Sequence, residues 1–323
     1  MIKKFVLQFT TFLFILILSF SSIQNPITTG YLYELQDHAK TVMSEQDPLY
    51  LEIMAKQSNY EMEAQDAHIH KVWKAIPGYN GLSVDIESSY NNMSQLGEFQ
   101  EERLVFNQIP PNITLKDLPP APIYRGHPDK PMVSLMVNVA WGNEFLPDIL
   151  KVMKEHNVKS TFFLDGSWVK NNPNLAKMIV EEGHEIGNHA YSHPDMKSLS
   201  RDRIVEELEK TNHIIEATLD HTPEWFAPPS GSFRQEVVDT ARELGMYTVL
   251  WTVDTVDWRK PEPNAMANRI VQEVDGGSLV LMHPTSSTLD GLEPMIEGIK
   301  KRGYILGTVS DVLSETRVTT TNE

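Results

Sequence analysis

A parallel α/β fold is predicted for most of this chain from the order of its segments. From Met132 onward, short apolar segments alternate with segments in which apolar residues recur at helical spacing. The connections are short, and polar clusters directly follow several of the apolar segments. Alternating strands and helices form parallel sheets, in which chemistry gathers at the carboxyl ends of the strands. The sequence therefore predicts a functional site along one edge of such a sheet.

The first 24 residues are predicted to be a targeting segment. Lys3 and Lys4 precede the apolar run Phe5–Phe20, which is the order found in an export signal. Because the run approaches the ~18–20 residues that span a bilayer, residues 1–24 are expected to be either a cleaved signal peptide or a retained membrane anchor. We therefore expect an exported protein, located outside the cell, in the cell wall or on the outer face of the plasma membrane.

Residues 25–109 are predicted to form a small N-terminal α/β domain that begins with a loose polar stretch. A helix is expected over Leu51–Ala75, where apolar residues recur at helical spacing. Strands are expected over Leu82–Ile86 and Leu104–Ile109. Nothing in this domain identifies chemistry.

Two further features precede the larger domain. His68 and His70 form a pair that could hold a metal, but such a pair on a predicted helix is more often solvated surface. Seven prolines then fall within residues 110–131. Proline-rich chain is extended and semi-rigid, so this segment is expected to be a linker between domains or a belt across a surface.

Residues 132–316 are predicted as one domain of alternating elements. The expected strands are Val133–Val139, Ser160–Leu164, Glu185–Ala190, Trp225–Ala227, Tyr247–Val253 and Ser278–Met282. The expected helices cover Leu146–Met153, Leu175–Ile179, Ile204–Leu219, Val237–Leu244, Asn264–Val274 and Leu292–Lys301. Gly183 closes the second of these helices, and Ser200 is placed to cap the third.

Composition excludes several classes of site in this domain. The chain has 323 residues, with 28 Lys and Arg, 44 Asp and Glu, and a formal charge of −16. It has no cysteine, which excludes disulfides, cysteine–zinc sites, iron–sulfur clusters, thiol nucleophiles and lipid-bearing cysteines. The acidic balance argues against nucleic acid as a partner and gives no attraction to anionic lipid.

Polar clusters follow five of the predicted strands. They are Asn138–Gly142, His189–His193, Ala227–Gly231, Asp254–Trp258 and Leu281–Pro284. Within the second cluster, two histidines stand four residues apart at a strand end, where neutral imidazoles can hold a transition metal. A single histidine would by default be structural, but five clusters at strand ends predict a functional site.

Two of these clusters carry a family resemblance. Gly183–His189 with His193-Pro194 resembles the second motif of the NodB-homology polysaccharide deacetylases, carbohydrate esterase family 4. Val253–Trp258 is similar to the fourth motif of that family, and the resemblance extends over about Pro131–Leu313. It implies a distorted (β/α) barrel with a metal at the strand ends. It also implies hydrolysis of N-acetyl, sometimes O-acetyl, groups on chitin-like or peptidoglycan sugars.

The resemblance assigns roles to residues of this chain. His189 and His193 match the two metal-binding histidines of the family, whose metal would be zinc or another divalent transition metal. His283 matches the general acid, and Asp257 matches the carboxylate that tunes its pKa.

The same resemblance implies how substrate would be held. The backbone N–H of Ser230 matches the group that helps to bind the oxyanion. Trp258 and Pro229 match positions of the substrate pocket.

Three positions depart from the family pattern. Asn138 stands at the position of the general base, and an amide cannot accept a proton at neutral pH. Val139 stands at the position of the third metal ligand and cannot ligate, so the metal is expected to be weakly held or absent. Ala227 replaces the arginine that positions the base, which fits the loss of its partner because an unpaired buried arginine is costly. Loss of a general base alone typically lowers the rate by ~10²–10⁴.

These departures predict an inactive or strongly impaired deacetylase homologue that binds cell-wall glycan or a protein partner outside the membrane. The alternative is an active metal-dependent N-deacetylase whose site is rewired, with Asp165 replacing the lost ligand and Asp254 as a weaker candidate. For Asp165, the cap of a following helix is the favoured interpretation. A third hypothesis makes the barrel a scaffold for the N-terminal domain, without glycan binding.

Overall fold

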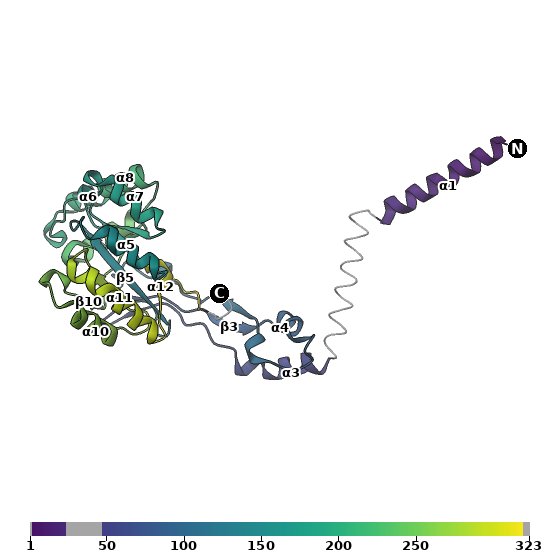
Figure 1. The fold of residues 1–323 in the computed structure, drawn as a ribbon, viewed down its shortest axis with the longest axis horizontal. Helices are drawn as coiled ribbons and strands as arrows, with labels where there is room; N and C mark the ends of the chain where they lie inside the picture. The colour runs from purple at the N-terminus through teal and green to yellow at the C-terminus, as the bar shows by residue number, and fades with distance from the viewer. Residues whose placement is uncertain (1, 24–46, 319–323) are drawn as a thin grey trace. The chain divides into compact units, whose positions relative to one another are not determined.

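The computed structural model describes residues 2–23 and 47–318 (Figure 1). The chain divides into two compact units, one of Met1–Met62 with Leu82–Asn107 and one of Glu63–Gly81 with Gln108–Glu323. This division differs from the predicted domain boundary, because residues 63–81 cluster with the larger unit. The loose stretch expected after the targeting segment falls on residues 24–46, outside the described residues.

Helix α1 (Ile2–Ile23) covers the predicted targeting segment. Among residues 2–23 and 47–318, no helix is long and apolar enough to cross a membrane.

Within residues 47–62 and 82–107, the smaller unit has two α-helices and most of a two-stranded sheet around a small apolar core. These elements are α3 (Pro48–Lys56), β3 (Gly81–Val84), α4 (Ile86–Met93) and β4 (Phe106–Ile109). The Asp85 carboxylate accepts a hydrogen bond from Ser88 N at 2.9 Å and so caps α4. That cap ends the strand predicted over Leu82–Ile86 at Val84, because Ile86 already begins the helix.

The helix predicted over Leu51–Ala75 is wrong beyond its first part. Helix α3 ends at Lys56, and the chain then forms an antiparallel hairpin of β1 (His68–His70) and β2 (Lys74–Ile76) in the larger unit. Ile69 is 47% exposed, although its spacing predicted one buried helical face.

The predicted histidine pair belongs to this hairpin. His70 Nδ1 accepts hydrogen bonds from Val72 N at 3.2 Å and Trp73 N at 3.0 Å, which holds the turn between the two strands. His70 therefore has a local structural role, in a hairpin and not on the predicted helix.

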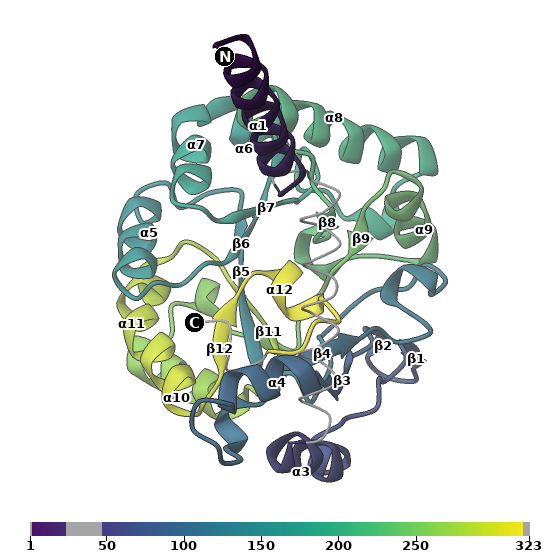
Figure 2. The ribbon, with the colours of Figure 1, turned by 90° about the vertical axis from the view of Figure 1, so that its right-hand side faces the viewer.

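The larger unit is built on an eight-stranded parallel sheet, curled with helices outside it (Figures 1 and 2). Its strands are β5 (Met132–Val139), β6 (Thr161–Leu164), β7 (Glu185–Asn188), β8 (Trp225–Phe226), β9 (Tyr247–Thr248), β10 (Val253–Asp254), β11 (Leu279–Met282) and β12 (Ile305–Gly307). The order is β10-β11-β5-β6-β7-β8-β9, and β12 also pairs with β5. The predicted parallel α/β fold is confirmed, and the expected strand over Tyr247–Val253 is two short strands.

Helices follow most of these strands. They are α5 (Leu146–Glu155), α6 (Gly166–Asn171), α7 (Pro173–Glu181), α8 (Arg201–Leu219), α9 (Gln235–Glu243), α10 (Pro263–Glu273), α11 (Ser286–Lys301) and α12 (Val309–Leu313). Ser200 occupies the residue before α8, as predicted, but its side chain makes no capping hydrogen bond.

Strand register decides which side chains reach the interior of the curled sheet. Val137 and Val139 belong to the apolar core that includes residues of the outer helices. Residues alternate between the two faces of a strand, so Met136 and Asn138 point to the opposite side. Met136 accordingly packs in a second apolar cluster, together with Phe163 of β6.

The proline-rich segment forms a belt within the larger unit. Strands β9 and β10 are the two ends of the sheet and do not pair with each other, so the curled sheet is open between them. The belt pairs with residues on both sides of this opening. Ile123 makes a bridge to Val249, next to β9, and Arg125 makes one to Ser278, next to β11. Ile123 is fully buried, so the segment is part of the core of this unit.

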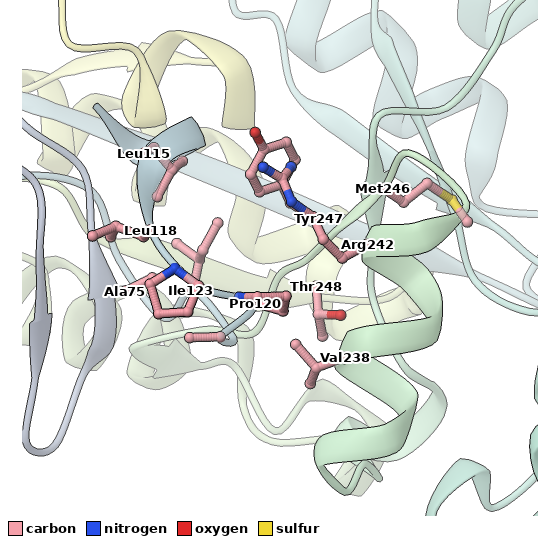
Figure 3. Close-up of a pocket in the computed structure, with 12 residues that line it drawn as sticks. Ala75, Leu115, Leu118, Pro120, Ile123, Val238, Arg242, Met246, Tyr247 and Thr248 are labelled. Atoms are coloured by element: carbon pink, nitrogen blue, oxygen red, sulfur yellow. The ribbon is translucent and has the colours of Figure 1, made fainter. Parts of the chain in front are cut away.

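Belt side chains pack against β9 and α9, as Figure 3 shows. Leu115, Leu118 and Pro120 face Tyr247 and Val238 around a hollow of about 10 Å³. A space of this size holds one water molecule at most, so this contact is a packing interface and not a ligand site.

Candidate functional site

A cavity of about 430 Å³ lies at the carboxyl ends of β5, β10 and β11 and next to the loops after β7 and β8. It is lined by Asn138, Ala140, Trp141, His189, His193, Ser230, Trp251, Asp254, Trp258, Leu281 and His283. All five predicted polar clusters contribute to this lining. A second hollow of about 490 Å³ shares His193 and Ser230 with it, so the two adjoin.

Asn138, at the position of the general base, borders the cavity, but its neighbours offer no group that could help it to activate water. Asn138 is 3% exposed, and its Oδ1 has no hydrogen-bond partner among the described residues. Ala227 is fully buried among apolar side chains that include Phe163 and Trp225. No cation therefore stands at position 227 to hold a base at position 138.

Val139 faces away from the cavity. Its side chain is fully buried in the apolar core with Leu146 and Leu164, as the alternation along β5 requires. The position of the missing metal ligand therefore lies among apolar groups.

The two predicted metal histidines lie together. The ring centroids of His189 and His193 are 5.2 Å apart. His189 Nδ1 donates to the carbonyl oxygen of Ala227 at 2.7 Å, which leaves Nε2 as its free nitrogen. Burial, with the nearby His193 and His283, lowers the pKa of His189 to about 3, so the ring is neutral at pH 7.

These two histidines do not fit a three-ligand zinc centre. A catalytic zinc needs three protein ligands, normally histidine or carboxylate in a chain without cysteine. Among the described residues, His156, Glu293 and Glu297 form a group of three such donors within 4.8 Å of one another. These residues lie at the outer helices α5 and α11 and do not line the cavity. Asp254 and His283 also line the cavity, but in the described part of the chain neither forms a group of three donors within 4.8 Å with His189 and His193.

Asp165, the residue considered as a substitute ligand, is used elsewhere. Its Oδ1 accepts hydrogen bonds from Trp168 N at 2.8 Å and Ser167 Oγ at 2.6 Å, and it caps α6. The side chain is 2% exposed and does not line the cavity. Burial raises the pKa of Asp165 despite these hydrogen bonds.

The residues matched to the general acid are arranged as a buried pair. The Asp257 carboxylate accepts hydrogen bonds from His283 N at 2.5 Å, His283 Nδ1 at 2.8 Å and Thr288 Oγ1 at 2.7 Å. Burial alone would raise the pKa of Asp257, but His283 and Thr288 hold it below its usual value. His283 is thereby fixed in orientation at the cavity wall.

Three tryptophans form much of the remaining wall, and the family resemblance assigns a role only to Trp258. Trp258 is 53% exposed and Trp141 is 46% exposed. Trp141 also stacks on the His283 ring at 5.8 Å with an interplanar angle of 9°. Trp251 lies between β9 and β10, inside a segment predicted as one strand. A tryptophan two residues after a strand end is the only sequence signal for Trp141.

Backbone strain is concentrated next to the cavity. Ala190, His193, Ser230 and Val256 adopt positive φ values of 60°, 53°, 54° and 53°. Such conformations are costly for residues other than glycine and cluster at functional sites. Pro229, predicted in the substrate pocket, is buried beside Ser230 and does not line the cavity.

Comparison with known proteins agrees with this geometry. The polysaccharide deacetylase family model matches residues 125–249. An uncharacterized protein of Bacillus subtilis, YlxY, is 51% identical, over 98% of this chain and 99% of its own length. A peptidoglycan-N-acetylglucosamine deacetylase of Bacillus cereus is 34% identical, over 56% of this chain and 67% of its own. The chain belongs to the polysaccharide deacetylases, carbohydrate esterase family 4.

Solved structures show the same fold in this family. The crystal structure of BA3943, a family 4 pseudoenzyme from Bacillus anthracis, matches with a TM-score of 0.81 and 53% identity. The match covers 84% of this chain and 97% of that one. A mutant of BA3943 described as having restored enzymatic activity matches with a TM-score of 0.81 and 52% identity, over 84% of this chain and 100% of that one. The predicted divergent membership of the family is confirmed.

Proposed function

We propose that this protein is a deacetylase homologue without efficient hydrolysis that binds cell-wall glycan in the cavity at the strand ends. The observation that carries the proposal is the combination of an aromatic wall with a missing water-activating half. Trp141, Trp251 and Trp258 offer apolar ring faces of the kind that pack against sugar rings. Asn138 cannot act as a base, and two histidines hold a metal poorly.

The pseudoenzyme part of the proposal is supported by a relative. BA3943 carries that description, and the fold of this chain matches it over most of its length. Peptidoglycan deacetylases among the relatives support a peptidoglycan or N-acetylglucosamine polymer as the ligand.

A deacetylation assay tests the catalytic half of the proposal. The purified chain is incubated with N-acetylglucosamine oligomers and with added zinc or cobalt, and free amine is measured. We expect no turnover above background. Clear turnover by the unmodified chain would favour the rewired enzyme instead.

A binding measurement tests the other half. We expect N-acetylglucosamine or glucosamine tetramers to bind with measurable heat in calorimetry. Trp258→Ala should weaken this binding about fivefold or more, since covering ~50 Å² of apolar ring surface contributes on the order of 1 kcal/mol. Trp73→Ala is the matched control, because Trp73 lies outside the cavity lining. If neither tetramer binds, the scaffold hypothesis replaces this one.

Export is a separate proposal that rests on the sequence. Lys3 and Lys4 before an apolar run are typical of an export signal, and a cell-wall ligand requires a location outside the membrane. Cell fractionation with an antibody to the folded units tests it. Recovery of the protein in the cytoplasm alone would contradict export.

A further inference from the structure

The charge of the cavity sets which glycan it can prefer. No lysine or arginine is among the residues that line it. Asp254 is the one carboxylate in the lining, and Asp257 lies behind His283, to which it is bonded. The lining thus has one carboxylate and no lysine or arginine, although the Arg259 guanidinium lies 4.6 Å from the ring centroid of Trp258.

The Asp254 carboxylate has a free acceptor. Its Oδ1 accepts a hydrogen bond from Val256 N at 2.8 Å, and its Oδ2 accepts none from any residue within 47–318. The nearby Arg269 forms no ion pair with this carboxylate. Arg269 donates to the backbone oxygens of Asp254 and Thr255, each at 2.9 Å, and pairs with Glu273 at 2.9 Å.

Strand register directs this carboxylate into the cavity. Asp254 on β10 is in register with Leu281 on β11, which also lines the cavity. Residues in register on neighbouring strands point to the same face of a sheet. A half-buried carboxylate without a cationic partner favours a cation brought by the ligand.

The tryptophan wall favours the same kind of ligand. A cation over the face of an aromatic ring is attracted by the ring quadrupole, most strongly for tryptophan. Trp141, Trp251 and Trp258 line the cavity that holds Asp254. The Arg259 guanidinium already lies 4.6 Å from the ring centroid of Trp258, and the Trp141 ring stacks on His283. The carboxylate and the aromatic wall are independent features, and both select positive charge.

We infer that this cavity binds hexosamine units with a free ammonium group in preference to their N-acetylated forms, with Asp254 as the specificity-determining residue. The inference rests on the proposed function and names the chemical class of its ligand. An ammonium group donates three hydrogen bonds and carries a charge, whereas an acetamide is neutral. A charge-assisted hydrogen bond to Asp254 is roughly twice as strong as a neutral one. The protein would then recognise glycan that has already been deacetylated, the product of a hydrolytic N-deacetylation.

Calorimetry with three tetramers tests the inference on the full chain. The probes are the glucosamine tetramer, the N-acetylglucosamine tetramer and cellotetraose, at mildly acidic pH and physiological salt. We expect the glucosamine tetramer to bind about tenfold more tightly than either neutral tetramer. Asp254→Asn should reduce that ratio to within about twofold, while affinity for the acetylated tetramer changes little.

A charge-matched variant distinguishes an effect of the cavity carboxylate from a general effect of the acidic protein surface. Asp290→Asn removes the same charge from an exposed position on α11 and should leave the preference unchanged. If Asp290→Asn abolishes the preference as well, general attraction to an acidic protein explains it and the inference is overturned.

The failure of the inference differs from the failure of the proposed function. Equal or tighter binding of the acetylated tetramer to the unmodified chain overturns the preference and leaves glycan binding intact. No binding of any tetramer overturns both. Because these results come from the unmodified chain, they hold even if Asp254→Asn does not fold.

Discussion

Asn138→Asp and Ala227→Arg, made singly and together, test whether the lost base and its lost arginine can be rebuilt as a pair. Asn138 borders the cavity, so an aspartate there retains some solvent and should cost about 1–3 kcal/mol of unfolding free energy. Ala227 is 0% exposed among apolar side chains, so an unpaired arginine there should cost about 3–5 kcal/mol. In the double variant the two charges can pair, and we expect a favourable coupling of about 0.5–3 kcal/mol.

Urea unfolding followed by tryptophan fluorescence measures these values. All six tryptophans lie in the larger unit, so the signal reports on the unit that holds the cavity. Ala176→Arg is the matched control for the cycle, because Ala176 is equally buried but lies in α7. Its cost should add to that of Asn138→Asp without coupling.

The coupling result decides whether the two positions act as a pair. Energies of Asn138→Asp and Ala227→Arg that add within about 0.5 kcal/mol would refute the assumption that the two side chains meet. Deacetylase activity is measured in parallel, with added zinc or cobalt, and some turnover is expected from the double variant. A folded double variant without any turnover would mean that the base and arginine alone do not repair the site.

The third repair, Val139→Asp, has a different expected effect. Val139 is 0% exposed in the apolar core and faces away from the cavity. An aspartate there is a buried charge among Leu146 and Leu164, so the triple variant should lose about 3–5 kcal/mol more. Higher activity of the triple variant would require the end of β5 to turn this side chain toward His189 and His193. Complete inactivity of a folded triple variant would mean that the cavity itself differs from that of the active family members.

Two further predictions concern buried titratable groups. Asp257→Asn replaces a carboxylate that accepts three hydrogen bonds. We therefore expect the free energy of unfolding, measured in urea, to fall by about 2–4 kcal/mol. An unchanged midpoint would contradict the role given to the bond between Asp257 and His283. His184 is 6% exposed, and burial lowers its pKa to about 4 from 6.5, with Ser160 N donating to its Nδ1. The unfolded chain therefore binds this proton between pH 6.5 and 4 while the folded chain does not, so stability falls by about 3 kcal/mol as pH decreases through that window. His184→Asn should flatten this part of the stability curve, and a curve that stays as steep would assign the effect to other groups.

The site could be anticipated from the sequence because parallel strands end at one edge. Each polar cluster follows an apolar segment, and the strand ends alone bring Asn138, His189 and His283 to one cavity. The orientation of Val139 also follows from simple alternation along β5 once the strand is known to extend that far.

Other features could not be read from local pattern. Ile69 and Val72 have helical spacing, yet they lie on an exposed hairpin, because His70 stabilises a turn that periodicity does not detect. Trp251 lies in an apolar segment that reads as one strand, but the pairing changes within it, since β9 joins β8 and β10 joins β11. Both outcomes depend on partners distant in sequence.

The proposed loss of hydrolysis and the inferred preference for an amine have one physical origin. In the family pattern a metal and an arginine bring positive charge to the cavity, and carboxylates balance it. Here Ala227 removes the arginine, and Val139 points into the core and leaves the metal without a third ligand. Asp254 stays, with one oxygen that no described residue satisfies. A cavity whose lining has no lysine or arginine but retains this carboxylate and a tryptophan wall is suited to a ligand that brings its own positive charge, and a deacetylated amino sugar meets that condition.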